Sequence, residues 1–165
     1  MQVRTPHGSF LVSYSTNVHA GESLDEVRRL LAEDVGLVKK RVAPDVPFGV
    51  ELRLGQAAIA ELGAGPALDD LAAWLAANDL FVFSLNGFPL RDFHAPTVKE
   101  NVYRPDWGET ERQQDTIRLA QILAALLPEG MEGSLSTSPG SYKPWGDHRA
   151  RRADLARGFA PVLAS

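Results

Sequence analysis

Apolar and polar positions along this chain follow two periods. Short, almost wholly apolar runs are typical of buried strands, and longer stretches with apolar residues three or four positions apart are typical of helices. The pattern predicts four strands, each followed by a helical stretch. The predicted strands are residues 10–15, 48–54, 80–85 and 131–136.

The helical stretches carry their own start and stop signals. Ser23 and Glu26 have the spacing of a capping box, and the apolar positions that follow continue to Val35. Gly36 either ends this first helix or lies inside a longer helix that stops before Pro44. Further helices are predicted at residues 56–62, 67–78, 109–127 and 147–161.

Strands that alternate with helices indicate an α/β protein with parallel strands and right-handed crossovers. A complete (β/α) TIM barrel has eight such units and about 250 residues. The four units here are half of that number, over a single domain of residues 1–165. The pattern alone leaves open whether the domain is a smaller open sheet or part of a barrel.

Composition narrows the class of protein. The chain is 44% hydrophobic and 23% charged, which is ordinary for a globular domain. Its net charge of -4 and the lack of a broad basic region argue against nucleic-acid binding. The absence of cysteine excludes disulfides and thiolate metal sites. No signal-peptide pattern or membrane-length apolar run occurs, so we expect a cytoplasmic protein without a membrane span.

Polar residues follow all four predicted strands. His19, Arg53 and Asn86 stand at or just after the ends of the first three, and Ser136, Thr137 and Ser138 stand at the end of the fourth. Ligands of parallel sheets and barrels bind at the carboxyl ends of the strands. We therefore expect these groups to converge on one rim and to form a candidate site.

His19 and Arg53 each have two interpretations. His19 is suited to general acid–base catalysis near neutral pH, or it caps local structure. Arg53 is suited to clamping a carboxylate or phosphate. The alternative for Arg53 is a structural ion pair with Glu51 or another acidic residue.

A loop of roughly twenty residues follows the third strand, a length that in an ordered loop usually indicates function. Asn86 at its start is suited to sugar hydroxyls and to an Asx-type turn, and the two roles are compatible. Phe88, Phe93 and Trp107 form either an apolar wall for a substrate or an anchor for the loop.

Four further polar residues are candidates. His94 and Lys99 are suited to proton transfer or anion binding, although a lysine is more often solvated. Tyr103 and Lys143 are weaker candidates for substrate binding. The turn at residues 134–140 has backbone N–H groups suited to an anion, and it is otherwise an ordinary turn.

Several segments together resemble the N-terminal part of the EboE-type metabolite-traffic proteins. That family consists of xylose-isomerase-like TIM barrels related to sugar phosphate isomerases and epimerases. The resemblance covers nearly the whole chain. The segments that carry it are residues 13–22, 47–54, 86–89, 98–103 and 134–144.

The resemblance implies the first half of a barrel. It predicts a small, polar, sugar-like metabolite as ligand and a reaction close to isomerisation or epimerisation. His19, Arg53 and Asn86 would then line half of the site. In the wider superfamily the ligands of a divalent metal lie mainly in the second half, so no metal ligand is assigned here. Two alternatives stay open: a non-catalytic binding module for metabolite traffic, and a partial barrel that pairs with itself or with a second half.

Overall fold

The computed structural model describes residues 2–63, 65–91, 99–146, 148–159 and 162. The strands of this part are β1 (Gln2–Thr5), β2 (Gly8–Leu11), β3 (Ser13–Ser15), β4 (Phe48–Arg53), β5 (Leu80–Asn86) and β6 (Ser134–Ser136). The α-helices are α1 (Leu24–Leu30), α2 (Gly36–Val42), α3 (Gln56–Leu62), α4 (Ala67–Ala77), α5 (Thr110–Leu126) and α6 (His148–Phe159). Shorter helical turns are η1 (Thr16–Val18), η2 (Leu31–Val35), η3 (Lys99–Tyr103) and η4 (Lys143–Trp145).

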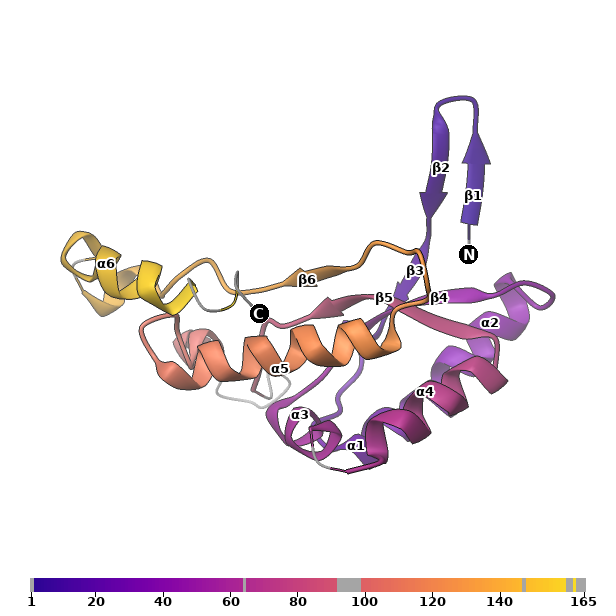
Figure 1. Cartoon of the computed structure of the whole chain (residues 1–165), viewed down its shortest axis with the longest axis horizontal. Coiled ribbons are helices and arrows are strands. Elements are labelled where there is room, and N and C mark those ends of the chain that lie inside the picture. The colour runs from indigo at the N-terminus through magenta and orange to yellow at the C-terminus, as the bar shows by residue number, and fades with distance from the viewer. Residues whose placement is uncertain (1, 64, 92–98, 147, 160–161, 163–165) are drawn as a thin grey trace.

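The central feature is a sheet in which β3, β4, β5 and β6 lie side by side in chain order (Figure 1). All three pairings are parallel. The predicted α/β class with parallel strands is therefore confirmed. Four neighbouring strands in chain order are compatible with half of a barrel.

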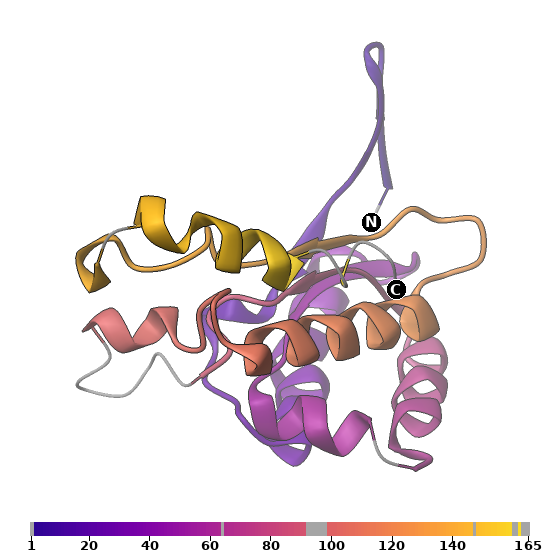
Figure 2. The same cartoon turned by 60° about the vertical axis from the view of Figure 1, so that its left-hand side comes forward.

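Helices α1 to α5 cover one side of this sheet (Figure 2). Alternate residues of the central strands point toward them, and Val50, Leu52, Val82 and Leu85 are fully buried there. The helices contribute Leu31, Val35, Leu71, Leu119 and others to the same core. The hydrophobic core therefore lies between the helices and one face of the sheet.

The other side, which we call the uncovered face, has no layer of helices over it (Figure 1). Glu51 lies on this face, beside Ser15 of β3 and Ser84 of β5. An irregularity in the β4–β5 register leaves Phe83 without a partner, so Phe83 and Ser84 both reach the uncovered face. The uncovered face is thus apolar near Phe83 and polar closer to the carboxyl ends.

The first predicted strand, residues 10–15, is wrong as a single element. Gly8–Leu11 pairs antiparallel with Gln2–Thr5 in a hairpin, and only Ser13–Ser15 joins the parallel sheet. Gly8 has φ of 138°, a conformation that favours glycine, and so permits the turn between the two hairpin strands. The hairpin extends from the uncovered side of the sheet (Figure 1).

The other element boundaries differ less from the prediction. The strand predicted at residues 131–136 is shorter, Ser134–Ser136. Gly36 lies inside the first helical stretch, which runs from α1 through the π-helical turn η2 into α2 and so continues to Val42. The capping box of Ser23 and Glu26 is confirmed. None of the helices in the described residues has the length and apolar character needed to cross a membrane.

Two glycines give opposite predictions for stability. A Cβ atom at Gly49 would lie 2.8 Å from Cε1 of Phe83 and 3.2 Å from the carbonyl oxygen of Val12, whereas at Gly36 the nearest such atom is 3.7 Å away. We expect Gly49→Ala to lower the free energy of unfolding by about 1–3 kcal/mol because it overpacks the site. Gly36→Ala should raise it by about 0.5–1 kcal/mol because alanine favours a helix. Urea unfolding measures both changes. A free energy of unfolding that is the same in Gly49→Ala as in the parent protein would contradict the close packing of Phe83 and Val12 around Gly49.

Candidate functional site

The carboxyl ends of the parallel strands lie along one edge of the sheet. Arg53 of β4 is the backbone partner of Asn86 of β5, which in turn is the partner of Ser136 of β6. His19 follows β3 after η1. The chain therefore brings all four strand ends to a common edge, but their side chains gather in separate groups.

Arg53 is buried and holds two loops together. Its guanidinium forms a 2.6 Å ion pair with Glu22 and donates to the carbonyl oxygen of Gly21 at 3.0 Å. It also donates to the carbonyl oxygens of Pro89 and Arg91. Of the two predicted roles, this geometry is that of a structural ion pair, with Glu22 rather than Glu51 as partner. A role for Arg53 in clamping a ligand stays a prediction.

His19 lies between a phenol and a carboxylate. Its Nε2 atom is 2.8 Å from the Tyr14 hydroxyl, and its Nδ1 atom is 3.6 Å from Oδ2 of Asp34. Asp34 comes from the π-helical turn η2, a type of turn that is frequent at functional sites. His19 is thus linked to groups at the β3 edge of the sheet, apart from Asn86 and Ser136.

Asn86 and Ser136 form a polar pair at the ends of β5 and β6. The Oδ1 atom of Asn86 accepts from the Ser136 hydroxyl at 2.8 Å and from the backbone N–H of Phe88 at 3.0 Å. The second bond confirms the predicted Asx-type turn. Within the described residues the amide nitrogen of Asn86 has no hydrogen-bond partner, so it is available to donate to a ligand.

Four half-buried rings gather next to this pair, and we call them the aromatic group. They come from the loops after β5 and β6. The centroid distances are 5.6 Å from Phe88 to Tyr103, 4.9 Å from Tyr103 to Tyr142 and 5.5 Å from Tyr142 to Trp145. The guanidinium carbon of Arg104 lies 4.3 Å from the centroid of the Trp145 ring. Such a surface is suited to a flat or ring-shaped ligand.

Trp107 serves as an anchor between the two loops. It is 1% exposed, and its indole N–H donates to the carbonyl oxygen of Ser138 at 3.0 Å. This geometry favours the anchoring role over the substrate wall. Lys143 lies in η4 at the surface, near Trp145.

The side chains of three predicted residues lie outside the described part of the structure. Lys99 begins η3, but its side chain is outside the described part. His94, like Phe93, belongs to residues 92–98, which also lie outside the described residues. Their proposed roles stay predictions.

A buried carboxylate fixes the loop that carries the aromatic group. Asp106 is 1% exposed, accepts from the Ser141 hydroxyl and from the Gly108 N–H, and pairs with Arg151 of α6 at 3.1 Å. Desolvation is the largest influence on the pKa of Asp106 and raises it. The hydrogen bonds from Ser141 and Gly108 and the charge of Arg151 together outweigh it, so the pKa lies below its usual 3.8.

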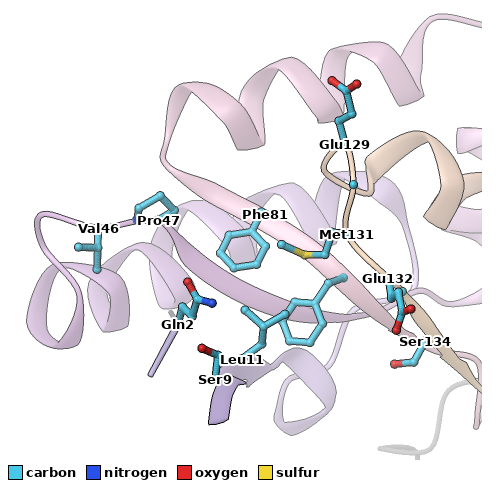
Figure 3. A pocket seen from close by; sticks show the side chains of 13 residues that line it. Gln2, Ser9, Leu11, Val46, Pro47, Phe81, Glu129, Met131, Glu132 and Ser134 are labelled. Carbon is cyan, nitrogen blue, oxygen red and sulfur yellow. The ribbon is translucent and has the colours of Figure 1, made fainter. Parts of the chain in front are cut away.

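A hollow of about 980 Å³ lies elsewhere, at the amino ends of the strands on the uncovered face. Figure 3 shows Phe81 and Met131 side by side in it, with Leu11 of the hairpin facing them. Its position is opposite to the carboxyl ends, where barrel active sites lie.

A metal-dependent barrel would need a cluster of histidine and acidic side chains. Within the described residues there is no group of three or more histidine or acidic side chains that could hold an ion. The described residues therefore do not fit a metal site. Comparisons with protein-family models, with curated proteins and with solved structures give no match to this chain.

Sequence reasoning missed several residues that the fold brings to the carboxyl edge. Tyr142 and Trp145 complete the aromatic group, and the aromatic residues of the segment after β6 were an available signal. Asp34 and Tyr14 on either side of His19 had no local signal. The Asp34 contact depends on how η2 packs beside His19, and the Tyr14 contact depends on the path of the chain through η1.

The Asp106–Arg151 pair gives a pH-dependent prediction. A carboxylate with a lowered pKa stabilises the fold above its unfolded value, and this stability is lost as the pH falls through its folded pKa, below 3.8. Arg151→Gln should raise the pKa of Asp106, move acid unfolding to a higher pH and cost about 1–3 kcal/mol at pH 7.

Circular dichroism from pH 2 to pH 7 measures this shift. Arg157→Gln is the matched control, because Arg157 lies on the same helix and pairs with the exposed Asp154. If both variants show the same acid transition as the parent protein, the pair does not stabilise the loop.

Proposed function

We propose that this chain is the N-terminal half of a xylose-isomerase-like barrel of the EboE type. We further propose that it binds a small, polar, sugar-like metabolite at the carboxyl ends of β5 and β6. The observation that carries this proposal is the aromatic group beside the amide nitrogen of Asn86, which has no partner within the described residues.

The chemistry of this edge supports a sugar-like ligand. Small-molecule sites combine apolar and aromatic surfaces with a few polar groups that fix orientation. Here half-buried rings supply the surface, and the Asn86 amide supplies a donor for a hydroxyl. Arg53 would act as a positioning residue, because it ties the loop after β3 to the loop after β5.

The reaction proposed by resemblance is isomerisation or epimerisation, with proton transfer next to a carbonyl. His19 has surroundings suited to proton transfer, since a carboxylate and a phenol flank its ring nitrogens. Because His19 lies at the β3 edge, this role would require a ligand that extends along the carboxyl edge from β6 toward β3. The competing proposal is a module that holds the metabolite without turnover, in keeping with the name of the family it resembles. A metabolite bound tightly but not converted would favour this module.

Trp145→Ala tests the location of the site. Isothermal titration against a panel of pentoses, hexoses and their phosphates should identify a ligand that the parent protein binds. Trp145→Ala removes a ring face, so it should lower the affinity for that ligand roughly tenfold, about 1.4 kcal/mol of binding free energy. Asn86→Ala should have a similar effect, because it removes the amide donor.

Phe10→Ala is the matched control, because Phe10 is an exposed ring of the hairpin, far along the chain from the aromatic group. It should bind the panel as the parent protein does. The same samples, assayed for sugar isomerisation with and without added divalent metal, separate turnover from binding. No binding to any member of the panel would contradict the proposed function.

A partner half is favoured by a separate observation. The hollow at Phe81 and Met131 exposes apolar side chains where a complete barrel has core. Among the described strands, none pairs with the outer edge of β3 or of β6. We propose that a second copy of this chain or another half-barrel covers this face. The hairpin residue Leu11 would lie at the base of that interface.

Size-exclusion chromatography with light scattering tests the pairing. We expect the purified chain to form a dimer, and Phe83→Glu to shift it to a monomer because a charge would then be buried in the interface. Val18→Glu, at an exposed position in η1, is the control and should leave the dimer intact. A parent protein that is monomeric at all concentrations would exclude self-pairing.

A further inference from the structure

The hairpin of β1 and β2 has no core of its own. It extends away from the sheet, and every residue of its two strands is exposed (Figure 1, Figure 2). A two-stranded hairpin is at best marginally stable in water unless it packs against other structure. This hairpin therefore needs a surface against which it can pack.

Exposed apolar side chains are concentrated in the same segment. Half of the exposed large apolar residues in the described part of the chain lie within residues 3–12. Val3 and Phe10 are direct partners across the two strands, so their side chains share one face of the hairpin. Phe10 is 53% exposed. This face is thus an apolar surface that solvent covers in the single chain.

The opposite face of the hairpin belongs to the hollow at the amino ends of the strands. Gln2, Ser9 and Leu11 line that hollow. Side chains alternate along a strand, so Val3 and Phe10 point away from the hollow of their own chain. In this arrangement a chain leaves its own hollow unfilled and its own apolar hairpin face uncovered.

The hollow has room for these side chains from a second chain. Its floor includes the rings of Phe81 and Phe83, whose centroids are 5.8 Å apart. Both rings lie over Gly49, where a Cβ atom would come within 2.8 Å of Phe83 and 3.2 Å of Phe81. A cavity of about 150 Å³ holds a benzene molecule. The hollow, at about 980 Å³, can therefore accept the ring of Phe10 together with Val3.

Charge favours the hairpin as the occupant of the hollow. Residues 2–12 contain Arg4 and no acidic residue. The described residues that line the hollow include Glu129 and Glu132, and none of them is basic. Two copies with a net charge of -4 each repel in general, so this local complementarity selects the one segment that the hollow attracts.

We propose that two copies of this chain exchange their hairpins, so that Val3 and Phe10 of each copy enter the hollow of the other. Because the hairpin adjoins the hollow in every chain, the two contacts lie about one two-fold axis. The pair therefore closes as a dimer and does not extend into a filament. The inference rests on the pairing proposed above, and it names the second copy as the partner and the hairpin as the segment that joins the copies.

Complementation between two variants tests the exchange. Phe10→Glu brings a carboxylate against Glu129 and Glu132, and Phe83→Lys places a charge at the floor of the hollow. By light scattering the parent protein should have twice the chain mass of 17.9 kDa, and each variant alone should have the chain mass. An equimolar mixture of the two variants should return to twice the chain mass. In the mixed pair one hairpin meets an intact hollow, and the two introduced charges attract each other at the second contact.

Leu37→Glu is the matched control. Leu37 is an apolar residue of α2 with 57% exposure, close to that of Phe10, and it lies outside the hairpin and the lining of the hollow. This variant introduces the same charge and should remain a dimer. Phe10 is not part of the hydrophobic core, so Phe10→Glu should keep the circular dichroism spectrum of the parent protein.

Three results would overturn the exchange. They are a monomeric parent protein, a folded Phe10→Glu variant that remains a dimer, and a mixture of the two folded variants that stays monomeric. If Phe83→Lys does not fold, the result for Phe10→Glu alone decides, since a hairpin outside the interface would leave the dimer intact.

The exchange and the proposed function fail in different ways. A dimer that Phe83→Glu dissociates and Phe10→Glu does not would keep the pairing of uncovered faces and reject the exchange. A monomeric parent protein would reject both self-pairing and exchange, and it would leave the metabolite site at the carboxyl edge to its own titration. A dimer that depends on Phe10, in a protein that binds no sugar of the panel, would keep the exchange and reject the metabolite site.

Discussion

The parallel hydrogen-bonded ladder that joins β3, β4, β5 and β6 determines where the other parts of this protein lie. Because the strands are parallel, their carboxyl ends share one edge, and the loops that follow them meet there. Because helices cover only one face, apolar Phe81 and Phe83 and polar Glu51 remain on the other. The metabolite site and the partner-half interface that we propose both follow from this one-sided arrangement.

Two buried charges hold the loops at the carboxyl edge, and they do so differently. Arg53 pairs with Glu22 and also binds carbonyl oxygens, so its charge is balanced within the protein. The guanidinium of Arg112 donates to the carbonyl oxygens of Pro105 and Gly87, and within the described residues its Nη2 atom has no hydrogen-bond partner.

Local patterns predicted much of this fold. The capping box at Ser23, the buried strands β4 and β5 and the long helix α5 follow from spacing alone, and the structure has them within a residue or two. The prediction was wrong where strand pairing determines the bounds of an element, since residues 10–15 divide between a hairpin and the parallel sheet. The candidate site was predicted only as a set of strand ends. The pairing of Arg53 with Glu22 and the unsatisfied state of Arg112 depend on packing between distant segments, which spacing does not encode.

The most direct test is a map of backbone chemical-shift changes on addition of the tightest-binding member of the panel of sugars and sugar phosphates. The account predicts that the changes gather at residues 86–88, 103–104, 136–138 and 142–145, the loops at the carboxyl ends of β5 and β6. Changes that gather instead in the hollow around Leu11, Phe81 and Met131 would contradict it, because the ligand would then occupy the amino ends of the strands.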